Sequence, residues 1–317
     1  MMSKKIGGNM GKFKIILNSI IYLILTSFLL YVLIKEDSVS KKMEVQRNKL
    51  TEKIISMAKI TKEKSIIIVR NTTWLLEFVM STALLLIIIR VFFIGNFIVP
   101  TGSMIPAIQI NDRLFANMGI YRFRKPRLEE IFLFREPVTN KDLYTKRVMG
   151  TPGDRVSIRN NGLYINNNKV TTREYVSTGK MGEETWLVPK KGDQIIIKPK
   201  MDYVEYLKNI NINVDQIQSY STENWYRIEE ILPNIEITVN GEPTGMILDF
   251  MHDPQYLSKL MNGETIEITT DQDYYFALGD NTYNSFDSRW WGFVSEKRIK
   301  GKPLVRFWPI TKAGFLK

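Results

Sequence analysis

The chain has 317 residues, and its 44 Lys and Arg against 33 Asp and Glu give a formal net charge of +11 at pH 7. The absence of cysteine excludes disulfides, cysteine nucleophiles and cysteine-based zinc sites. The one histidine, His252, has no neighbour at metal-ligand spacing. A His-rich metal site is therefore excluded, and a Ser-His-Asp enzyme would have to depend on this residue, which we expect to be a surface or packing residue.

The first predicted element is a membrane span at about 13–34. The stretch FKIILNSIIYLILTSFLLYVLIK has no charged residue between Lys14 and Lys35. About 20 apolar residues are enough to cross a bilayer as a helix. A cleavable signal sequence is the alternative, because lysines precede the run. The apolar core is too long for one, however, and no small-residue cleavage site follows.

A second apolar run covers 74–100. Glu77 and Arg90 bracket its most apolar part, so a span has to recruit flanking residues, and 75–94 would suffice. Arg90 could then extend its charge to the membrane interface. The alternative is the buried core helix of a soluble protein.

The linker between these runs, residues 35–73, carries ten Lys and Arg against five Asp and Glu. The positive-inside rule favours a cytoplasmic position for such a loop and external positions for both termini, although the N-terminal tail is basic as well. Apolar spacing within 43–64 predicts a helix. Because much of the positive charge lies here and no basic stripe with interleaved aromatics remains, we expect no nucleic-acid partner.

From about Phe97 the chain changes to short β-prone runs separated by turn signals such as NNG, KKGD and NGEP. This pattern is not built from βαβ units and predicts a mainly β domain. Strands are expected at 130–134, 143–149, 155–158, 194–198, 236–241, 265–269, 274–278 and 303–308. Helices are expected at 201–217 and 254–261.

The segment PTGSMIP, residues 100–106, is the first candidate site. Gly102 removes a side chain beside Ser103, and Pro100 and Pro106 stiffen the loop on both sides. A nucleophile needs such exposure and pre-organisation. The alternative is an ordinary turn serine.

The second candidate is Lys146, within YTKRVMGTPGD at 144–154. Tyr144, Lys146 and Val148 share one face of the predicted strand. If that face is buried, the ammonium is disfavoured and the pKa of Lys146 falls toward neutrality, which makes its amine a useful base. The alternative is a solvated lysine on an edge strand.

The third candidate is LGDNTYNSFDSRWWGF at 278–293, a stretch dense in Asn, Asp and Ser whose alternative role is loop scaffolding. A hydroxyl nucleophile needs a base within hydrogen-bond reach, and the only histidine has no supporting pattern. A neutral lysine can do the same task, and Ser-Lys hydrolases exist. The three segments together therefore favour a Ser-Lys enzyme.

The order of a membrane span, PTGSMIP, YTKRVMGTPGD and GDNTYNSFDSRWWGFV closely resembles the bacterial type I signal peptidases, membrane-bound Ser-Lys proteases that cut signal peptides from exported proteins. The likeness covers roughly 93–154 and 274–308, and its last motif is highly specific. It implies that Ser103 is the nucleophile and Lys146 the general base. The Thr101 side chain and the Ser103 amide would hold the oxyanion, and Ser285 would orient the lysine.

The resemblance also assigns supporting residues. Met104 and Tyr144 fall where the family lines the small pocket for the residue before the cut. The structural residues expected near the site are Asp280, Asp287 and Arg289. Two of the family's usual Gly-Asp pairs are replaced here, by Asn111-Asp112 and by Glu129-Glu130. These departures put turn geometry in doubt and leave the chemistry unchanged.

The implied architecture is a signal-peptidase-like catalytic β core formed by 99–160 and 271–317. A β-rich cap domain is inserted at 161–270, and a membrane anchor with two helices occupies 1–98. The implied location is the bacterial cytoplasmic (inner) membrane, multi-pass, with the catalytic domain on the extracytoplasmic side. No cofactor is expected.

The partners implied are signal peptides of secreted pre-proteins, cut after small residues, together with membrane lipid and the secretion translocon. VRFWP at 305–309, with Trp290 and Trp291, would rest on the bilayer, unless these aromatics are core. Two other functions stay open: a Ser-Lys self-cleaving repressor-type protease, and a non-catalytic membrane-anchored binding protein.

Overall fold

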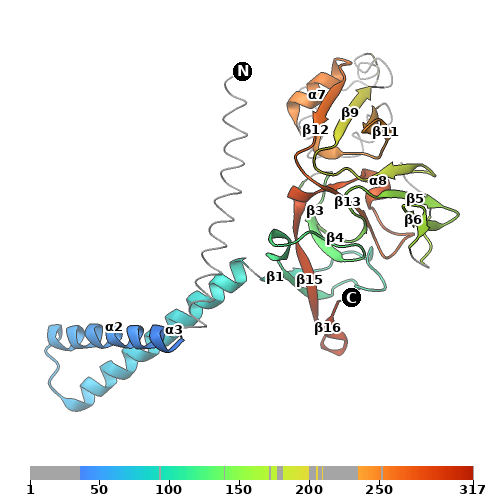
Figure 1. The fold of residues 1–317 in the computed structure, drawn as a ribbon. Coiled ribbons are helices and arrows are strands. Elements are labelled where there is room, and N and C mark those ends of the chain that lie inside the picture. Colours follow the sequence, from blue (N-terminus) through green and yellow to red (C-terminus); the bar gives the residue numbers. More distant parts are fainter. Residues whose placement is uncertain are drawn as a thin grey trace. The chain divides into compact units, whose positions relative to one another are not determined.

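The computed structural model describes residues 36–92, 94–138, 140–170, 173–176, 181–199, 205, 209, 235–250 and 253–316. The chain divides into two compact units, Met1–Ile94 and Gly95–Lys317 (Figure 1). The predicted span at 13–34, most of the predicted helix at 201–217 and His252 lie outside the described residues.

Two helices make up the described part of the first unit: α2, Glu36–Met57, and α3, Glu63–Phe92. They pack against each other through polar contacts. Arg47 donates to Glu77 at 3.1 Å, and the hydroxyls of Thr51 and Thr73 lie 2.8 Å apart. Because the later residue of α2 meets the earlier residue of α3, the two helices run in opposite directions.

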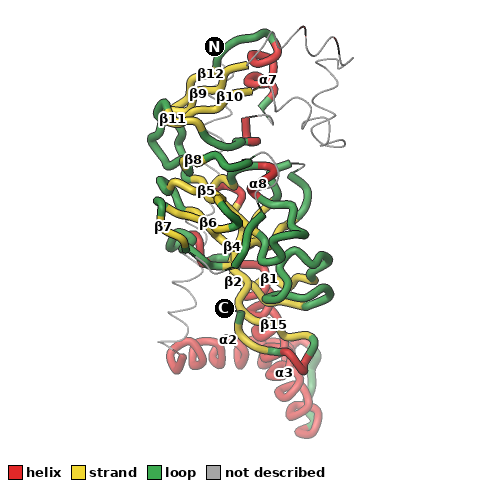
Figure 2. Tube along the Cα trace, turned by 90° about the vertical axis from the view of Figure 1, so that its right-hand side faces the viewer, coloured by secondary structure: helices red, strands yellow, loops and turns green. Residues whose placement is uncertain are grey.

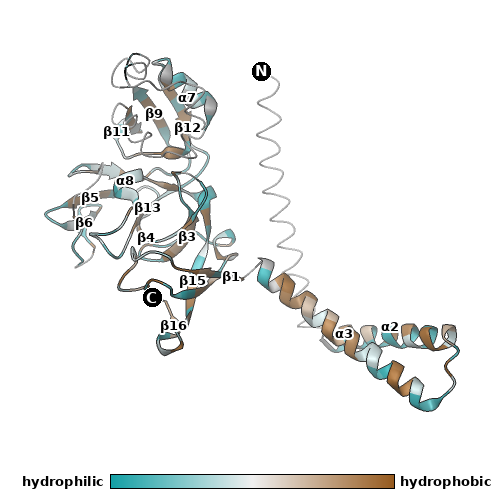
Figure 3. Ribbon diagram, turned by 180° about the vertical axis from the view of Figure 1, so that it is seen from behind, coloured by the Kyte–Doolittle hydropathy of each residue, from teal (hydrophilic) through white to brown (hydrophobic). Residues whose placement is uncertain are grey.

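Among the described residues, α3 is the one helix whose length and apolar composition suffice to cross a membrane, over Glu63–Ile88. Figure 3 colours much of it as hydrophobic. Its apolar side chains, among them Leu84 and Ile87, are largely exposed, as suits a lipid-facing helix. Glu77 is paired with Arg47, which lowers the cost of a carboxylate beside an apolar run. The span predicted at 75–94 lies mostly within α3, which begins at Glu63 and ends at Phe92, and Ile94 already belongs to a strand. The span at 13–34 stays a prediction.

Three β-sheets form the second unit, and the largest has eight strands in the order β1-β2-β15-β3-β4-β13-β14, with β16 paired to β15. Its strands are β1 (Ile94–Ile98), β2 (Arg113–Asn117), β3 (Ile131–Arg135), β4 (Leu143–Gly150), β13 (Tyr274–Leu278), β14 (Val294–Ser295), β15 (Ile299–Trp308) and β16 (Gly314–Phe315). In this sheet β4 lies between β3 and β13, with antiparallel pairing on both sides.

The other two sheets have four strands each, in the orders β7-β6-β5-β8 and β11-β10-β9-β12. Their strands are β5 (Arg155–Arg159), β6 (Gly162–Ile165), β7 (Asn168–Lys169), β8 (Thr185–Leu187), β9 (Gln194–Pro199), β10 (Ile235–Val239), β11 (Glu242–Pro243) and β12 (Ile266–Thr269). The helices among the described residues of this unit are α7 (Pro254–Met261), α8 (Ser288–Trp291) and the 3-10 turns η1 (Ile120–Arg122), η3 (Leu248–Phe250), η4 (Glu296–Arg298) and η5 (Ile310–Lys312). Figure 2 shows the sheet of β9 to β12 gathered with α7 at one end of this unit.

The unit is mainly β, as expected, and each of the eight predicted strands is a strand in the structure. The helix predicted at 254–261 is α7, which begins with Pro254 after the capping side chain of Asp253. β15 begins four residues before the predicted 303. Pro303 stands inside it beside a register shift, where a missing N–H is tolerated.

One hydrophobic core joins the three sheets. Phe132 of β3, Val148 of β4, Trp186 of β8, Ile195 of β9 and Phe276 of β13 are all buried in it. β5, from the predicted catalytic core, pairs with β6 and β8, from the predicted insertion. Gly95–Lys317 therefore forms one compact unit, and the boundaries of a cap at 161–270 stay a prediction.

Asn111 and Glu129 each stand where the resemblance led us to expect glycine, and both have φ of 65°. This left-handed conformation costs an L-residue roughly 1–2 kcal/mol, less for Asn than for Glu. The departures from glycine therefore leave the turns in place and store a little strain at each.

We expect Glu129→Gly to stabilise the fold by roughly 0.5 kcal/mol, because relief of left-handed strain outweighs the greater entropy of glycine in the unfolded chain. Denaturant unfolding of the detergent-solubilised chain measures this. Asn111→Gly is the matched variant and should gain less. A Glu129→Gly chain less stable than the parent would contradict the expectation.

Candidate active site

Ser103 lies on the loop between β1 and β2, and this loop is folded back by its own backbone. The amide of Ile105 donates to the carbonyl of Gly102 at 3.1 Å, and that of Ile108 donates to the carbonyl of Met104 at 2.9 Å. A small hydrophobic cluster anchors the loop from below, made up of Val99, Met104, Ile108, Leu114 and Ile131. Ser103 itself stays partly exposed while its neighbour Met104 is buried.

Lys146 is buried in the middle of the largest sheet, with 3% of the residue exposed. Its strand pairing sets it opposite Phe132 of β3. Val148 on the same face is buried, and Tyr144 is half-buried with its ring centroid 5.6 Å from the amine. Lys146 is therefore not the solvated lysine of an edge strand.

The amine of Lys146 and the hydroxyl of Ser103 are in direct contact. Nζ donates to Oγ at 2.6 Å, across 43 positions of sequence. This is the distance at which a base can take a proton from a nucleophile. The arrangement can therefore activate a serine without a histidine.

Burial lowers the pKa of Lys146 from its ordinary 10.5 to about 8. The carboxylates of Asp287 and Asp280 oppose the shift, and Arg289 adds to it. The unfolded chain keeps this proton up to about pH 10.5, so between pH 8 and 10.5 it binds more protons than the folded chain. The free energy of unfolding therefore rises with pH across that window, and below it the lysine costs the fold about 3 kcal/mol.

The part of the last motif that joins β13 to α8 holds the candidate nucleophile loop, residues 99–112, by further contacts. The backbone amide of Asn281 donates to the carbonyl of Ser103 at 2.9 Å, and its side-chain amide donates to the carbonyl of Gly102 at 3.0 Å. Gly279 approaches so closely that an added Cβ would lie 2.1 Å from Ser285 Oγ and 2.6 Å from the Ser103 carbonyl. This loop thus fixes the backbone on which the hydroxyl is mounted.

Two buried carboxylates of the motif are paired with arginines. Asp287 and Arg289 form a two-pronged pair at 2.8 and 2.9 Å. Asp280 accepts from Arg147 at 2.7 and 2.8 Å and from Arg173 at 2.5 Å. Such pairs satisfy charges that could not otherwise stay in the interior.

Of the remaining residues implied by the resemblance, Tyr144 has its ring near the Lys146 amine, and no described hydrogen bond joins Thr101, Met104 or Ser285 to the dyad. The Ser285 hydroxyl is buried and has no hydrogen-bond partner among the described residues. Thr101 is exposed. Their roles, and the pocket roles of Met104 and Tyr144, stay predictions.

Three residues in contact with the site were not singled out from the sequence. Asn281 lies within the last motif, two residues after Gly279, where an Asx side chain in a turn is a signal for hydrogen bonding to nearby backbone. Arg147 follows the candidate base directly. Nothing in the sequence pointed to Arg173, because it lies in a stretch without any motif and pairs with Asp280, 107 positions away.

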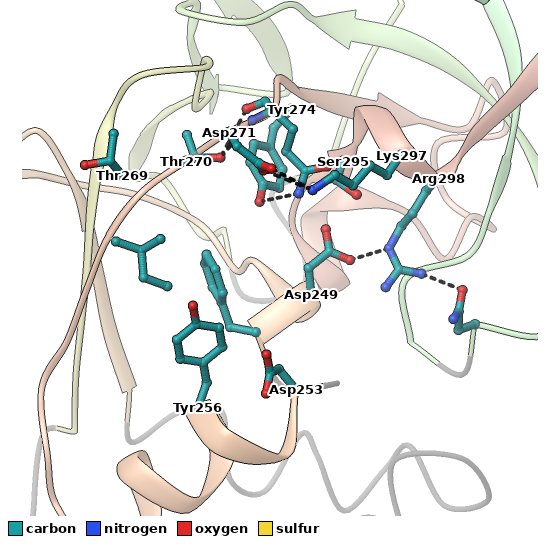
Figure 4. A pocket seen from close by; sticks show the side chains of 14 residues that line it. Asp249, Asp253, Tyr256, Thr269, Thr270, Asp271, Tyr274, Ser295, Lys297 and Arg298 are labelled. Atoms are coloured by element: carbon teal, nitrogen blue, oxygen red, sulfur yellow. Dashed lines mark hydrogen bonds and ion pairs between the residues drawn. The ribbon is translucent and has the colours of Figure 1, made fainter. Parts of the chain in front are cut away.

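A separate hollow of about 560 Å³ lies among η3, α7, β12, β13 and η4 (Figure 4). Four of its charged side chains form two ion pairs, Asp249 with Arg298 and Asp271 with Lys297, and Asp253 caps α7. None of the candidate catalytic residues lines it. In the described part of the chain, no group of His, Asp and Glu is arranged to hold a metal ion.

Comparison with protein-family models matches residues 71–308 to "Signal peptidase, peptidase S26". The chain belongs to this family. It is a serine peptidase, and so a hydrolase.

Among curated proteins, this signal peptidase is similar to a "Probable signal peptidase I-2" from Synechocystis sp., with 27% identity over 84% of this chain and 86% of that protein. It is also similar to a "Signal peptidase I" from Buchnera aphidicola, with 30% identity over 71% of this chain and 73% of that protein. A signal peptidase I structure from Enterococcus faecalis aligns with 56% of this chain and 97% of that one, at 21% identity and a TM-score of 0.24, too low to inform the fold.

We expect Gly279→Ala to lower kcat/KM at least 100-fold, because the new methyl group would displace the nucleophile loop, and a misplacement of about 1 Å has that cost. A pre-protein cleavage assay on the detergent-solubilised enzyme measures it. Gly314→Ala adds a methyl group with no atom within 4 Å and serves as control. Full activity in Gly279→Ala would show that the loop tolerates the displacement.

Proposed function

We propose that this signal peptidase removes signal peptides from exported pre-proteins with Ser103 as nucleophile and Lys146 as general base. The observation that carries the proposal is the 2.6 Å contact between a serine hydroxyl and a lysine amine buried in the sheet. Burial supplies the base, since only the neutral amine can accept the proton.

In the first half-reaction, neutral Lys146 takes the proton of Ser103 as Oγ bonds to the scissile carbonyl carbon. The resulting ammonium gives that proton to the leaving amine as the C–N bond breaks. The signal peptide is then esterified to Ser103. In the second half-reaction Lys146 takes a proton from a water molecule as that water attacks the ester. The ammonium returns the proton to Ser103 Oγ as the acyl C–O bond breaks, so that both residues regain their starting states.

The oxyanion of both steps would be held by the Ser103 amide and the Thr101 hydroxyl. The Ser103 amide makes no hydrogen bond to another described residue, so it is open to a ligand. Asn281 donates to the carbonyls of Gly102 and Ser103 in this loop and does not occupy the Ser103 amide. One such donor contributes about 3 kcal/mol to transition-state stabilisation.

Substrate choice would follow from a small pocket lined by Met104 and Tyr144, next to the nucleophile and the base respectively. Met104 is immobilised in the cluster under the loop, and Tyr144 packs edge-on against Phe134. Rigid side chains would reject large residues before the cut by steric exclusion. Ser285, which is buried beside Gly279, would orient the lysine amine.

The enzyme would be anchored in the bacterial cytoplasmic membrane by spans at 13–34 and within α3, with the basic linker inside and the catalytic unit outside. Lipid contact is supported by exposed apolar side chains at the β15–β16 end: Trp308, Ile310 at 74% and Phe315 at 83% exposure. Trp291 was expected there as well, but it is buried against Phe134. The secretion translocon would deliver the substrates.

Ser103→Ala and Lys146→Ala should each lower cleavage of a pre-protein at least about 10,000-fold, because each removes one half of the proton-transfer pair. The assay is the same pre-protein cleavage in detergent. Ser258→Ala and Lys259→Ala replace an exposed serine and lysine on α7 and should cleave normally. Normal cleavage by Lys146→Ala would rule the mechanism out.

The pH dependence of kcat/KM should show one ascending limb with a midpoint near 8, because the fraction of neutral Lys146 rises through its pKa. Below that midpoint the rate should fall about tenfold per pH unit, and above it the rate should level off. A limb with its midpoint near 10.5 would mean that the base is hydrated, contrary to the proposal.

A further inference from the structure

Residues 173–176 and Met181, which lie outside the three motifs, contact the last motif repeatedly. Arg173 donates to Asp280 at 2.5 Å, and the carbonyl of Val176 accepts from Arg289 at 3.1 Å. Further along, the amide of buried Met181 donates to the carbonyl of Arg289 at 3.3 Å. These residues belong to the segment 161–270, to which no role in catalysis has been given above.

Asp280 depends on this segment for part of its neutralisation. Its side chain is fully buried, and it faces two guanidinium groups from different parts of the chain, Arg147 on β4 and Arg173. Oδ2 accepts from Arg147, and Oδ1 accepts from both arginines. Removing one cation from a buried pair leaves charge uncompensated, which is strongly unfavourable.

The chain neighbours of Asp280 are the residues that hold the nucleophile. Gly279 packs against the Ser103 carbonyl, and Asn281 donates to the carbonyls of Gly102 and Ser103. Any movement of Asp280 is therefore passed directly to the loop that carries the hydroxyl.

We propose that Arg173 is a positioning residue of the dyad: by pairing with Asp280 it holds the loop 279–281 against the nucleophile loop and balances a carboxylate close to Lys146. This inference rests on the proposed function. It assigns part of the predicted insertion to the catalytic machinery, through Asp280 and without contact to the substrate.

The charged groups near Lys146 decide in which direction its pKa changes when Arg173 is removed. They are Asp287 and Arg289 from α8 and its cap, and Asp280 from the end of β13. With Arg173 removed, Arg147 alone would balance Asp280, so the carboxylate would favour the lysine ammonium more strongly. Lys146 would then keep its proton to a higher pH.

The test is Arg173→Met in the full-length, detergent-solubilised enzyme, with kcat/KM for a pre-protein measured from pH 6 to pH 10. We expect the midpoint of the ascending limb to move to higher pH by about 0.5 unit. This shift by itself lowers kcat/KM about threefold at pH 7 and leaves it unchanged at the plateau, at pH values above the limb. Loosening of the nucleophile loop should add a loss of about tenfold at every pH. Arg173→Lys keeps the charge and should return the limb to its original position.

Arg155→Met is the matched control, because Arg155 forms an exposed ion pair with Glu242 and has no contact with the last motif. It should leave both the rate and the limb unchanged. Wild-type behaviour of Arg173→Met, or a loss of rate with an unmoved limb that Arg173→Lys does not restore, overturns the inference. If Ser103→Ala and Lys146→Ala lose cleavage in that experiment, the proposed function survives; if they still cleave, both are overturned.

Discussion

The catalysis that we propose depends on one contact, the hydrogen bond from Nζ of Lys146, on a β-strand, to Oγ of Ser103, on a loop. The sheet order contributes to this contact, because β4 lies between β3 and β13 and Lys146, in the middle of β4, is buried. An exposed lysine at the same distance would stay protonated at neutral pH and could accept nothing. Burial of the base and proximity to the serine are therefore both required, and the antiparallel pairing of β3, β4 and β13 provides the first.

The proximity of Ser103 to this base is provided by the loop 99–112, which two sets of contacts hold in place. Below it, Met104 and Ile108 pack into a small apolar cluster. Above it, Asn281 and Gly279 bind or contact its carbonyls, and Asp280 between them is fixed by Arg147 and Arg173. These contacts leave the Ser103 hydroxyl to Lys146 and leave the Ser103 amide without a hydrogen bond to another described residue. The site is thus assembled from segments far apart in sequence, joined by the main sheet.

The extent to which this could be predicted from sequence varied with the range of the interaction. Strand periodicity predicted β4 and the shared face of Tyr144, Lys146 and Val148, because alternation is a local property. It could not decide whether that face was buried, since this depends on β3 and β13 as neighbours. Very short strands such as β7 and β14, with two residues each, carry too little pattern to be seen. Arg173 lies beyond the reach of local pattern, because its partner is chosen by the packing of a distant segment.

The buried lysine also bears on how such a chain can change over time. At neutral pH its amine is held in an environment that opposes its ammonium form, and the rest of the fold must offset about 3 kcal/mol for it. A descendant that no longer needed to cut peptides would gain stability by exchanging this side chain for an apolar one of similar length. The lysine is therefore a residue that only continued selection for activity would preserve, and its loss in a relative would be an early sign that hydrolysis had been abandoned.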